Sequence, residues 1–460
     1  MYEHSESNHL CNCCGNIDVI GLGIPAVILY AAPVLRFKMR TGILFLCTII
    51  LEVKIVYTGM EYKEARNLLL NCTRPVSAEQ IPLDEADGRI LAQSVTAVLD
   101  VPPFDRSPYD GYAFRAEDSS NASRETPVTL RILEEIPAGS VWTHEVVSGT
   151  ATKILTGAPI PPGADAVTKY EDTEFSAESV TIFSPSKSGD NVVSRGEDVL
   201  KGQLLALPGT PVDSALLGTL AAQGITNPLV YRVPVIGILS TGSELIEAGE
   251  PLSCGKIVNT NRHTFSAAVR HAGCSVRNYG IIGDDPDAIS VLIAKAIDEC
   301  DMVISTGGVS VGDYDYTPDA MERAGIDLLI RSLKLKPGGA SAYGIKNGRL
   351  ICALSGNPAS ALVNFYAVVL PALRKLTGLS SPLLPELTVT LKEDFHKRSP
   401  RTRLIRGRLE LSDGTAVMSV DRGQGNGVLH SLIGCNLLAE IPAGSPELQA
   451  GTKLQAYFIP

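Results

Sequence analysis

The sequence is poor in aromatic residues and lacks any long run of positive charge. Phe, Trp and Tyr together make up 5% of the 460 residues, and the formal net charge is −10. Proteins that bind a nucleic acid backbone carry a basic patch or stripe, so this composition argues against nucleic acid as a partner. A negative balance leaves room for a small anionic ligand, because local lysines and helix ends decide that contact.

The chain also lacks the paired cysteines of a structural zinc site. Seven of its ten cysteines are scattered singly in mostly apolar surroundings, at positions 47, 72, 254, 274, 300, 352 and 435. Such residues are typical of the reduced core of a cytoplasmic protein, and we expect a cytoplasmic location. Cys11, Cys13 and Cys14 contain one C-x-x-C spacing, but no second pair follows to complete four zinc ligands.

The first 59 residues are hydrophobic but lack the basic start of a secretory signal. Residues 19–35 carry no charge and approach the minimum length of a membrane span, whereas the uncharged run 41–51 is too short. Three interpretations are open: a membrane anchor, a peripheral hydrophobic extension, or a translated leader before a natural start near Met60. The last is favoured, because an amphipathic helix begins directly after Met60. Membrane contact is expected only if residues 17–57 belong to the mature protein.

Periodicity and turn residues divide the rest of the chain into four parts. Mixed segments at 60–99 and 198–232 flank a β-domain at 100–197, in which short β-type runs alternate with Pro/Gly turns. Strands and helices alternate over 233–383, which predicts a doubly wound, mostly parallel α/β sheet. Short β runs over 384–460 predict a small all-β domain. Helices are expected over 61–71, 84–91, 213–220, 262–272, 286–300 and 359–376.

The stretch 302–319 is the most informative part of the chain. It begins as a short apolar strand, and then glycines at 307, 308 and 312 let backbone amides approach an anion at positive φ. A helix start follows at 317–319. A strand, a glycine turn and a helix in this order form a phosphate site, and the acidic residues near the turn indicate a divalent cation. The alternative is an ordinary strand-to-helix turn.

Small and charged residues follow or flank each of several strands predicted in the α/β segment, including the one just described. They lie at 240–244, 283–285, 306–315, 334–339 and 355–360. Ligands of parallel sheets bind at the carboxyl ends of the strands, so these segments would place glycine turns, lysines, hydroxyls and carboxylates around one rim. Lysines neutralise phosphate or oxyanion charge, carboxylates hold Mg²⁺, and the helix start after residue 357 adds free amides. Each segment alone is also explained as turn chemistry.

Two proline-stiffened loops in the β-domain carry further polar groups. The loop 100–113 has three prolines and three aspartates, and the loop 155–166 has a similar texture. Rigid loops suit the positioning of catalytic groups. The alternative is a rigid structural crossing.

Several ordered motifs resemble those of the molybdopterin molybdenumtransferases, a family that includes the E domain of gephyrin. The motifs are 103–113, 156–159, 195–198, 240–245, 259–261, 283–286, 307–317, 336–338 and 356–358. The resemblance covers nearly the whole chain after Met60. It implies an elongated dimerising domain from the two mixed segments, an inserted β-domain, a molybdopterin-binding α/β domain and a C-terminal β-barrel. It also implies a homodimer with its active site between the subunits.

The resemblance implies a Mg²⁺-dependent reaction in which adenylylated molybdopterin takes up molybdate and AMP leaves. By position in the motifs, the catalytic residues are Asp110, Thr156, Glu244, Asp284 and Asp315, of which the three aspartates would hold Mg²⁺. Lys336 matches the lysine that binds the oxyanion. The substrate-binding positions are Thr241, Gly242, Gly307, Gly308, Ser310, Lys336, Pro337, Gly338, Ser355, Gly356, Asn357 and Ser360. The molybdopterin adenylyltransferase and molybdoenzymes are further expected partners.

The chain departs from the family pattern at a few positions near these residues. Gly339 stands where the family often has a second lysine, Ser243 where aspartate is frequent, and Arg106 where asparagine is frequent. Pro108-Tyr109 replaces Ala-Met. These changes bear on the choice between molybdate and tungstate. The alternatives are a tungstate-preferring version of the reaction, adenylylation of molybdopterin alone, and a non-catalytic scaffold with the same fold.

Overall fold

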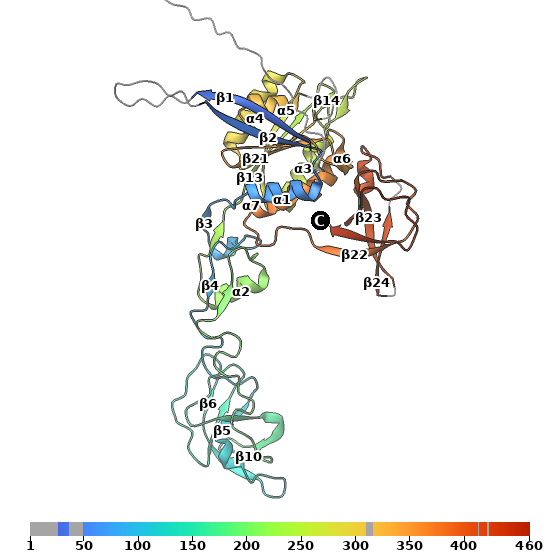
Figure 1. The fold of residues 1–460 in the computed structure, drawn as a ribbon. Coiled ribbons are helices and arrows are strands. Elements are labelled where there is room, and N and C mark those ends of the chain that lie inside the picture. The colour runs from blue at the N-terminus through green and yellow to red at the C-terminus, as the bar shows by residue number, and fades with distance from the viewer. Residues whose placement is uncertain (1–25, 36–48, 310–315, 413, 421–422) are drawn as a thin grey trace, which may run out of the picture. The chain divides into compact units, whose positions relative to one another are not determined.

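The computed structural model describes residues 26–35, 49–309, 316–412, 414–420 and 423–460. The chain divides into two compact units (Figure 1). The smaller unit contains residues 80–87 and 91–230, and the larger unit contains the remainder. Two short strands, β3 (Ala78–Gln80) and β12 (Leu229–Tyr231), lie where the chain passes between the units.

An eight-stranded sheet forms the centre of the larger unit, in the order β1-β2-β18-β20-β21-β17-β13-β16. Its strands are β1 (Ala26–Leu35), β2 (Ile49–Thr58), β13 (Val235–Thr241), β16 (Ser275–Ile282), β17 (Met302–Thr306), β18 (Asp327–Ile330), β20 (Ser341–Lys346) and β21 (Arg349–Leu354). The four strands β21, β17, β13 and β16 run parallel, whereas β20 pairs antiparallel on both sides. The expected doubly wound, mostly parallel sheet is therefore confirmed.

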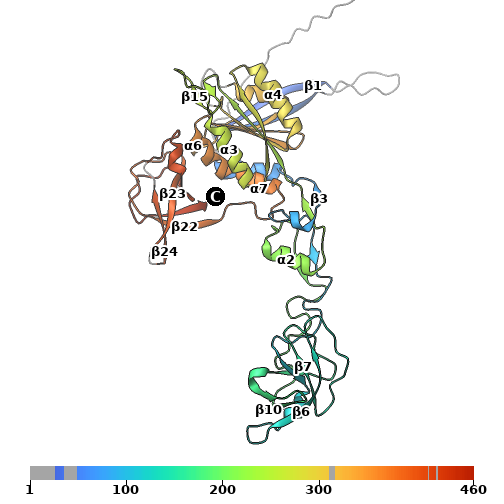
Figure 2. The ribbon, with the colours of Figure 1, turned by 180° about the vertical axis from the view of Figure 1, so that it is seen from behind.

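Helices cover both faces of this sheet (Figure 2). One face is covered by α1 (Tyr62–Cys72), α3 (Thr260–His271) and the long helix Pro358–Leu376. The other is covered by α4 (Pro286–Glu299) and α5 (Thr317–Arg323). Alternate residues of a strand pack on opposite faces of the sheet. Met302 and Ile304 pack on the face covered by α1 and α3, and Val303 packs on the face covered by α4 and α5. This double burial explains why the strands appear as continuous apolar runs.

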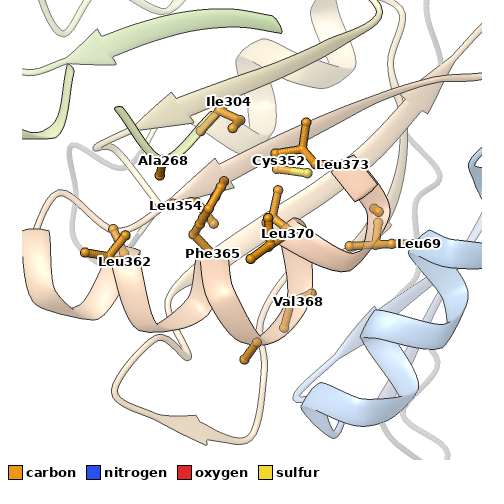
Figure 3. Packing of buried hydrophobic residues seen from close by; sticks show 14 of the residues in the cluster. Leu69, Ala268, Ile304, Cys352, Leu354, Leu362, Phe365, Val368, Leu370 and Leu373 are labelled. Atoms are coloured by element: carbon orange, nitrogen blue, oxygen red, sulfur yellow. The ribbon is translucent and has the colours of Figure 1, made fainter. Parts of the chain in front are cut away.

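The long apolar helix spans Pro358–Leu376 and lies inside the core (Figure 3). It consists of α6 (Pro358–Asn364), a π-helical turn (Phe365–Val369) and α7 (Leu370–Leu376). Within the described residues it is the one helix long and apolar enough to span a membrane, with a mean hydropathy of 1.2, but 89% of it is buried. Its composition therefore reflects packing against the sheet.

The sheet continues into residues that precede Met60. Tyr57 pairs in parallel with Ile330, and the backbone N–H of Arg331 donates to the Tyr57 carbonyl at 2.8 Å. The side chain of Val56 is 2% exposed within the apolar cluster under α4 and α5. The sequence favours a leader before Met60, and in the structure the end of that segment, β2, adds a strand to the α/β sheet.

Five strands of the larger unit close into a barrel near the C-terminus, as the C-terminal β-barrel prediction required. They are β22 (Glu386–Leu391), β23 (Thr402–Ser412), β24 (Thr415–Val420), β25 (Leu437–Ile441) and β26 (Lys453–Phe458). The pairing β23-β24-β22-β26-β25 returns to β23, so no edge strand remains among the five. The short strand β19 (Leu335–Lys336) pairs in parallel with β23 and so connects the barrel to the α/β sheet.

The smaller unit is built on a six-stranded sheet in the order β8-β5-β7-β6-β10-β9. Its strands are β5 (Gly111–Phe114), β6 (Val128–Ile136), β7 (Thr150–Ile154), β8 (Ala166–Lys169), β9 (Thr173–Phe175) and β10 (Ser179–Ile182). A second cluster contains β4 (Val95–Thr96), β11 (Leu204–Ala206) and α2 (Ser214–Ala222). The helix expected over 84–91 is wrong: only a 3₁₀ turn, Leu83–Glu85, forms before Gly88, whose φ of +70° ends a right-handed helix.

Five of the six described cysteines are free thiols: Cys72, Cys254, Cys274, Cys300 and Cys352. Cys274, Cys300, Cys352 and Cys435 are buried as expected, whereas Cys72 is half-buried and Cys254 is exposed. Cys11, Cys13, Cys14 and Cys47 lie outside the described residues.

An ion pair between Arg232 and Asp301 fixes the start of β13. Arg232 donates from Nη1 to Asp301 Oδ2 at 2.7 Å, and the backbone N–H of Val235 donates to the same oxygen at 2.8 Å. Burial raises the pKa of Asp301, but the hydrogen bonds from Arg232 and Val235 outweigh it, so the net pKa lies below its ordinary value.

The Asp301→Ala variant is expected to lower the free energy of unfolding at pH 7 by about 2 kcal/mol, the size of a hydrogen bond to a charged group. Because the folded pKa is depressed, this contribution is present above the unfolded pKa of about 4 and is lost as the pH falls through the folded pKa. Urea unfolding at several pH values checks this. The exposed Asp298→Ala is the control, and an equal effect of the two variants would contradict the prediction.

Candidate active site

The carboxyl ends of the four parallel strands meet at one edge of the sheet. Ser240 on β13 is level with Thr306 on β17, and Thr306 is level with Leu354 on β21. On the other side, Thr241 is level with Ile282 at the end of β16. The loops that follow these strands fall in the predicted segments 240–244, 283–285, 306–315 and 355–360, so the structure brings the described parts of these four segments together.

Glycines allow the loops after β13, β17 and β21 to touch backbone to backbone. Gly307 has φ +101°, and a Cβ there would overlap the carbonyl oxygen of Thr241. Gly308 has φ +62°, and a Cβ there would lie 2.5 Å from Thr317 Oγ1. Gly356 lies next to Gly307, because a Cβ added to Gly356 would be 3.6 Å from the Gly307 Cα. A ligand at this edge would therefore meet main-chain groups unobstructed by side chains.

Two buried asparagines beneath the loops have unused polar atoms. Asn259 Oδ1 accepts from Ser240 Oγ at 3.2 Å, and Asn261 Nδ2 donates to the Gly356 carbonyl at 2.9 Å. Asn259 Nδ2 and Asn261 Oδ1 are buried without a partner in the structure. An unsatisfied buried group costs roughly 1–3 kcal/mol, so both atoms fit a site completed by a ligand or water. The motif 259–261 was recognised in the sequence, but neither asparagine was predicted as a site residue.

Asp284 and Glu244 supply the described carboxylates of the rim. The backbone N–H of Ser243 donates to Asp284 Oδ2 at 2.9 Å, and the backbone N–H of Asp284 donates to Ser243 Oγ at 3.1 Å. Ser243, where the family often has aspartate, thus orients Asp284. The exposed Glu244 carboxylate lies against Gly242, where a Cβ would be 2.5 Å from Oε2.

The described part of the site offers Mg²⁺ a partial set of ligands. Asp315 and Ser310 lie outside the described residues, and the described ones contain no group of three or more His, Cys, Asp or Glu that could hold a metal. Mg²⁺ commonly takes one or two carboxylates together with phosphate oxygens and waters. Asp284, which is half-buried, suits such a shared site.

The Lys336-Pro337-Gly338 turn is attached to the barrel on one side and to α6 on the other. Lys336 pairs with Arg403 of β23, and the Gly338 carbonyl accepts from Asn364 Nδ2 at 2.6 Å. The Lys336–Pro337 peptide is cis. The Lys336 side chain is exposed and forms no ion pair within the described chain, so its charge is available to an anion.

Gly339 has no room for the lysine that the family often has at this position. A Cβ on Gly339 would lie 2.7 Å from the Leu335 carbonyl oxygen and 2.8 Å from the Leu333 carbonyl oxygen. The Gly339 carbonyl also accepts from the backbone N–H of Leu333 at 2.9 Å. The chain therefore lacks the second lysine, and the backbone around residue 339 leaves no space for its side chain.

A loop of the barrel covers the start of α6. The backbone N–H of Ser360 donates to the Asn426 carbonyl at 3.0 Å, and the Asn357 N–H donates to Ser355 Oγ at 3.2 Å. Two of the amides expected to bind an anion at this helix start are therefore already used. The buried Arg406 supports the loop by donating to the Gly423 carbonyl at 2.7 Å. Sequence reasoning missed this loop, because only the fold brings residue 426 to α6.

Asp110 and Thr156 lie together in the smaller unit. The backbone N–H and the hydroxyl of Thr156 donate to Asp110 Oδ1 at 2.7 and 2.8 Å. These bonds, first from the backbone and then from the hydroxyl, hold the pKa of Asp110 below its ordinary value, and Lys153 contributes in the same direction. The carboxylate is thus kept ionised and oriented.

Comparison with protein families assigns most of the chain. Residues 60–224 match the MoeA N-terminal region (domains I and II), residues 237–375 match a probable molybdopterin binding domain, and residues 388–459 match the MoeA C-terminal region (domain IV).

Individual proteins are similar over nearly the full length. Proteins named molybdopterin molybdenumtransferase are 34% identical in Staphylococcus epidermidis over 394 residues and 34% identical in Bacillus subtilis over 406 residues. These alignments cover 86% and 87% of this chain and 94% of each relative. A crystal structure of the molybdopterin biosynthesis moeA protein from Pyrococcus horikoshii aligns with a TM-score of 0.75 at 33% identity, over 87% of this chain and all of that one.

The Gly339→Ala variant is expected to destabilise the protein by about 1–3 kcal/mol, because a methyl group would be forced between two carbonyl oxygens. Gly218→Ala is the matched control, since a Cβ at that position on α2 meets nothing within 4 Å and alanine favours a helix. Thermal unfolding should give a lower midpoint for the first variant and an equal or higher one for the second. Equal midpoints for Gly339→Ala and wild type would contradict the steric account.

Proposed function

The chain belongs to the molybdopterin molybdenumtransferase family, and we propose that it is a transferase that inserts molybdate into adenylylated molybdopterin with Mg²⁺ and releases AMP. Water cleaves the phosphoanhydride, so that AMP leaves and the pterin keeps its phosphate. The two dithiolene sulfurs replace two oxygens of molybdate, and these leave as two water molecules that take up the two thiol protons and the two protons released by the hydrolysis. The cytoplasm is the proposed location, which suits the free thiols of Cys72, Cys254, Cys274, Cys300 and Cys352.

The observation that carries this proposal is the convergence of four glycine-containing or carboxylate-containing loops at one edge of the sheet. Gly307 and Gly308 present backbone next to the Thr241 loop, which suits a pyrophosphate that must be approached closely. Asn259 and Asn261 retain buried polar atoms that a polar pterin ring could satisfy. An edge used only for folding would have no need to leave these atoms unpaired.

Asp284 is assigned to hold the divalent cation, and Asp315 and Asp110 are the further carboxylates proposed to bind Mg²⁺. Bound Mg²⁺ would withdraw charge from the phosphoanhydride and ease the departure of AMP. Ser243 keeps the Asp284 carboxylate in place through the paired hydrogen bonds. Thr156 does the same for Asp110. Both carboxylates are therefore set in position before substrate arrives.

Lys336 is assigned to bind molybdate, and Glu244 is assigned a catalytic role as a carboxylate of the rim. The single available lysine at the turn 336–338 supplies one charge for the oxyanion, since Gly339 excludes the second. This loss keeps tungstate as a second candidate substrate. We further propose a homodimer, in which the β-domain that carries Asp110 and Thr156 takes part in the reaction. A scaffold alone would need neither carboxylate.

Incubation with adenylylated molybdopterin, Mg²⁺ and either molybdate or tungstate tests the proposal by AMP release and metal incorporation. The Asp284→Ala variant is expected to reduce AMP release at least a hundredfold, because the cation loses its oriented carboxylate. Asp298→Ala, at the far end of α4, should behave as wild type. Unchanged release in Asp284→Ala would remove this residue from the mechanism.

The Lys336→Ala variant is expected to raise the KM for molybdate about tenfold or more while changing the KM for the nucleotide substrate less than twofold, because one charge-assisted contact is lost. Steady-state kinetics with each substrate varied in turn measures both constants. Lys346→Ala is the control, because Lys346 lies away from the turn and its Nζ is 3.7 Å from Asp298 Oδ1. Equal weakening of the two substrates would contradict the oxyanion role of Lys336.

A further inference from the structure

The long apolar helix contains one buried asparagine. Asn364 is the last residue of α6, directly before the π-helical turn, and it is 1% exposed. Its neighbours Val363 and Phe365 are fully buried apolar residues. An amide at such a position costs free energy unless both of its ends find partners.

Both ends of the Asn364 amide are used, and the bonds lead to the Lys336 turn. Asn364 Nδ2 donates to the Gly338 carbonyl at 2.6 Å, and Asn364 Oδ1 accepts from the Tyr343 hydroxyl at 2.6 Å. Tyr343 lies on β20 and is 0% exposed. A buried chain of hydrogen bonds therefore runs from the sheet, through the helix, to the carbonyl two residues after Lys336.

The turn also packs tightly against the helix at this point. Gly338 has φ +104°, and a Cβ there would lie 2.9 Å from the Asn364 Cβ and 3.2 Å from the Ser360 carbonyl oxygen. On its other side, Lys336 is held by the pairing of β19 with β23. The backbone of the turn is thus fixed from two directions, while the Lys336 side chain stays exposed.

Packing alone does not explain the polar chain. Leucine and phenylalanine of similar volume at 364 and 343 would fill the same space without burying an amide and a phenol. Burying the polar side chains of Asn364 and Tyr343 costs more free energy than burying apolar ones. Their hydrogen bonds, however, fix the orientation of the donor, the acceptor and the peptide that carries the acceptor. The peptide fixed here is the one that follows Gly338, two residues after the proposed oxyanion-binding lysine.

We propose that Asn364 and Tyr343 are positioning residues that hold the turn 336–338 so that Lys336 meets the oxyanion. This inference rests on the proposed function and extends it to two residues outside the rim. Misplacement of a binding group by about 1 Å can cost up to a hundredfold in rate, so a loosened turn should be felt in the use of molybdate.

The test compares Asn364→Leu and Tyr343→Phe with wild type in steady-state kinetics. Asn364→Leu is expected to raise the KM for molybdate about tenfold, and Tyr343→Phe less, since the Asn364–Gly338 bond survives in it. The KM for adenylylated molybdopterin should change less than twofold in both. Tyr279→Phe is the matched control, because its hydroxyl is bonded to Glu299 at 2.8 Å on another part of the sheet. It should leave both constants unchanged.

A double-mutant cycle separates positioning from general stability. If Asn364 acts through Lys336, adding Asn364→Leu to Lys336→Ala should raise the molybdate KM no further. Additive effects, or a lower unfolding midpoint with an unchanged molybdate KM in both single variants, would overturn the inference. If Asn364→Leu does not fold, Tyr343→Phe and its cycle with Lys336→Ala give the answer. Absence of AMP release by the wild type would instead refute the proposed function.

Discussion

The contact between Gly307 and the Thr241 carbonyl is the constraint on which the site depends. A side chain at residue 307 would push the loops after β13 and β17 apart, because its Cβ would overlap that oxygen. With glycine, the two loops and Gly356 of the third share one layer at the carboxyl edge of the parallel sheet. Backbone, rather than side chains, therefore forms the floor of the site, which is the arrangement that phosphate binding needs.

The C-terminal barrel completes this edge instead of standing apart from it. The barrel strand β23 pairs with β19, which contains Lys336. In a barrel loop, the Asn426 carbonyl accepts a hydrogen bond from the Ser360 N–H at the start of α6. Arg406 in turn supports that loop from inside the barrel. Lys336 and the carboxyl edge of the sheet thus belong to one compact unit, and Asn364 joins the turn 336–338 to β20 through its two hydrogen bonds.

Local patterns predicted the sheet and its rim well, because strand runs, glycine turns and helix starts are encoded within a few residues. Long-range contacts could not be read in this way. Arg406 lies within a β-type run and gives no sign that it binds a loop seventeen or more residues away. Asn364 looked like a helix residue without a role. The helix predicted over 84–91 is absent because of Gly88, and Val56 is part of the core although it lies in the segment for which the sequence favours a leader.

Hydrogen–deuterium exchange tests most directly whether the rim is where the substrate binds. On addition of saturating adenylylated molybdopterin, amide exchange should slow at residues 241–244, 306–309 and 355–360, which lie at the carboxyl ends of β13, β17 and β21. Exchange in β10 and β24, which belong to other sheets, should not change. Unaltered exchange at all three rim segments with the ligand bound would contradict the account.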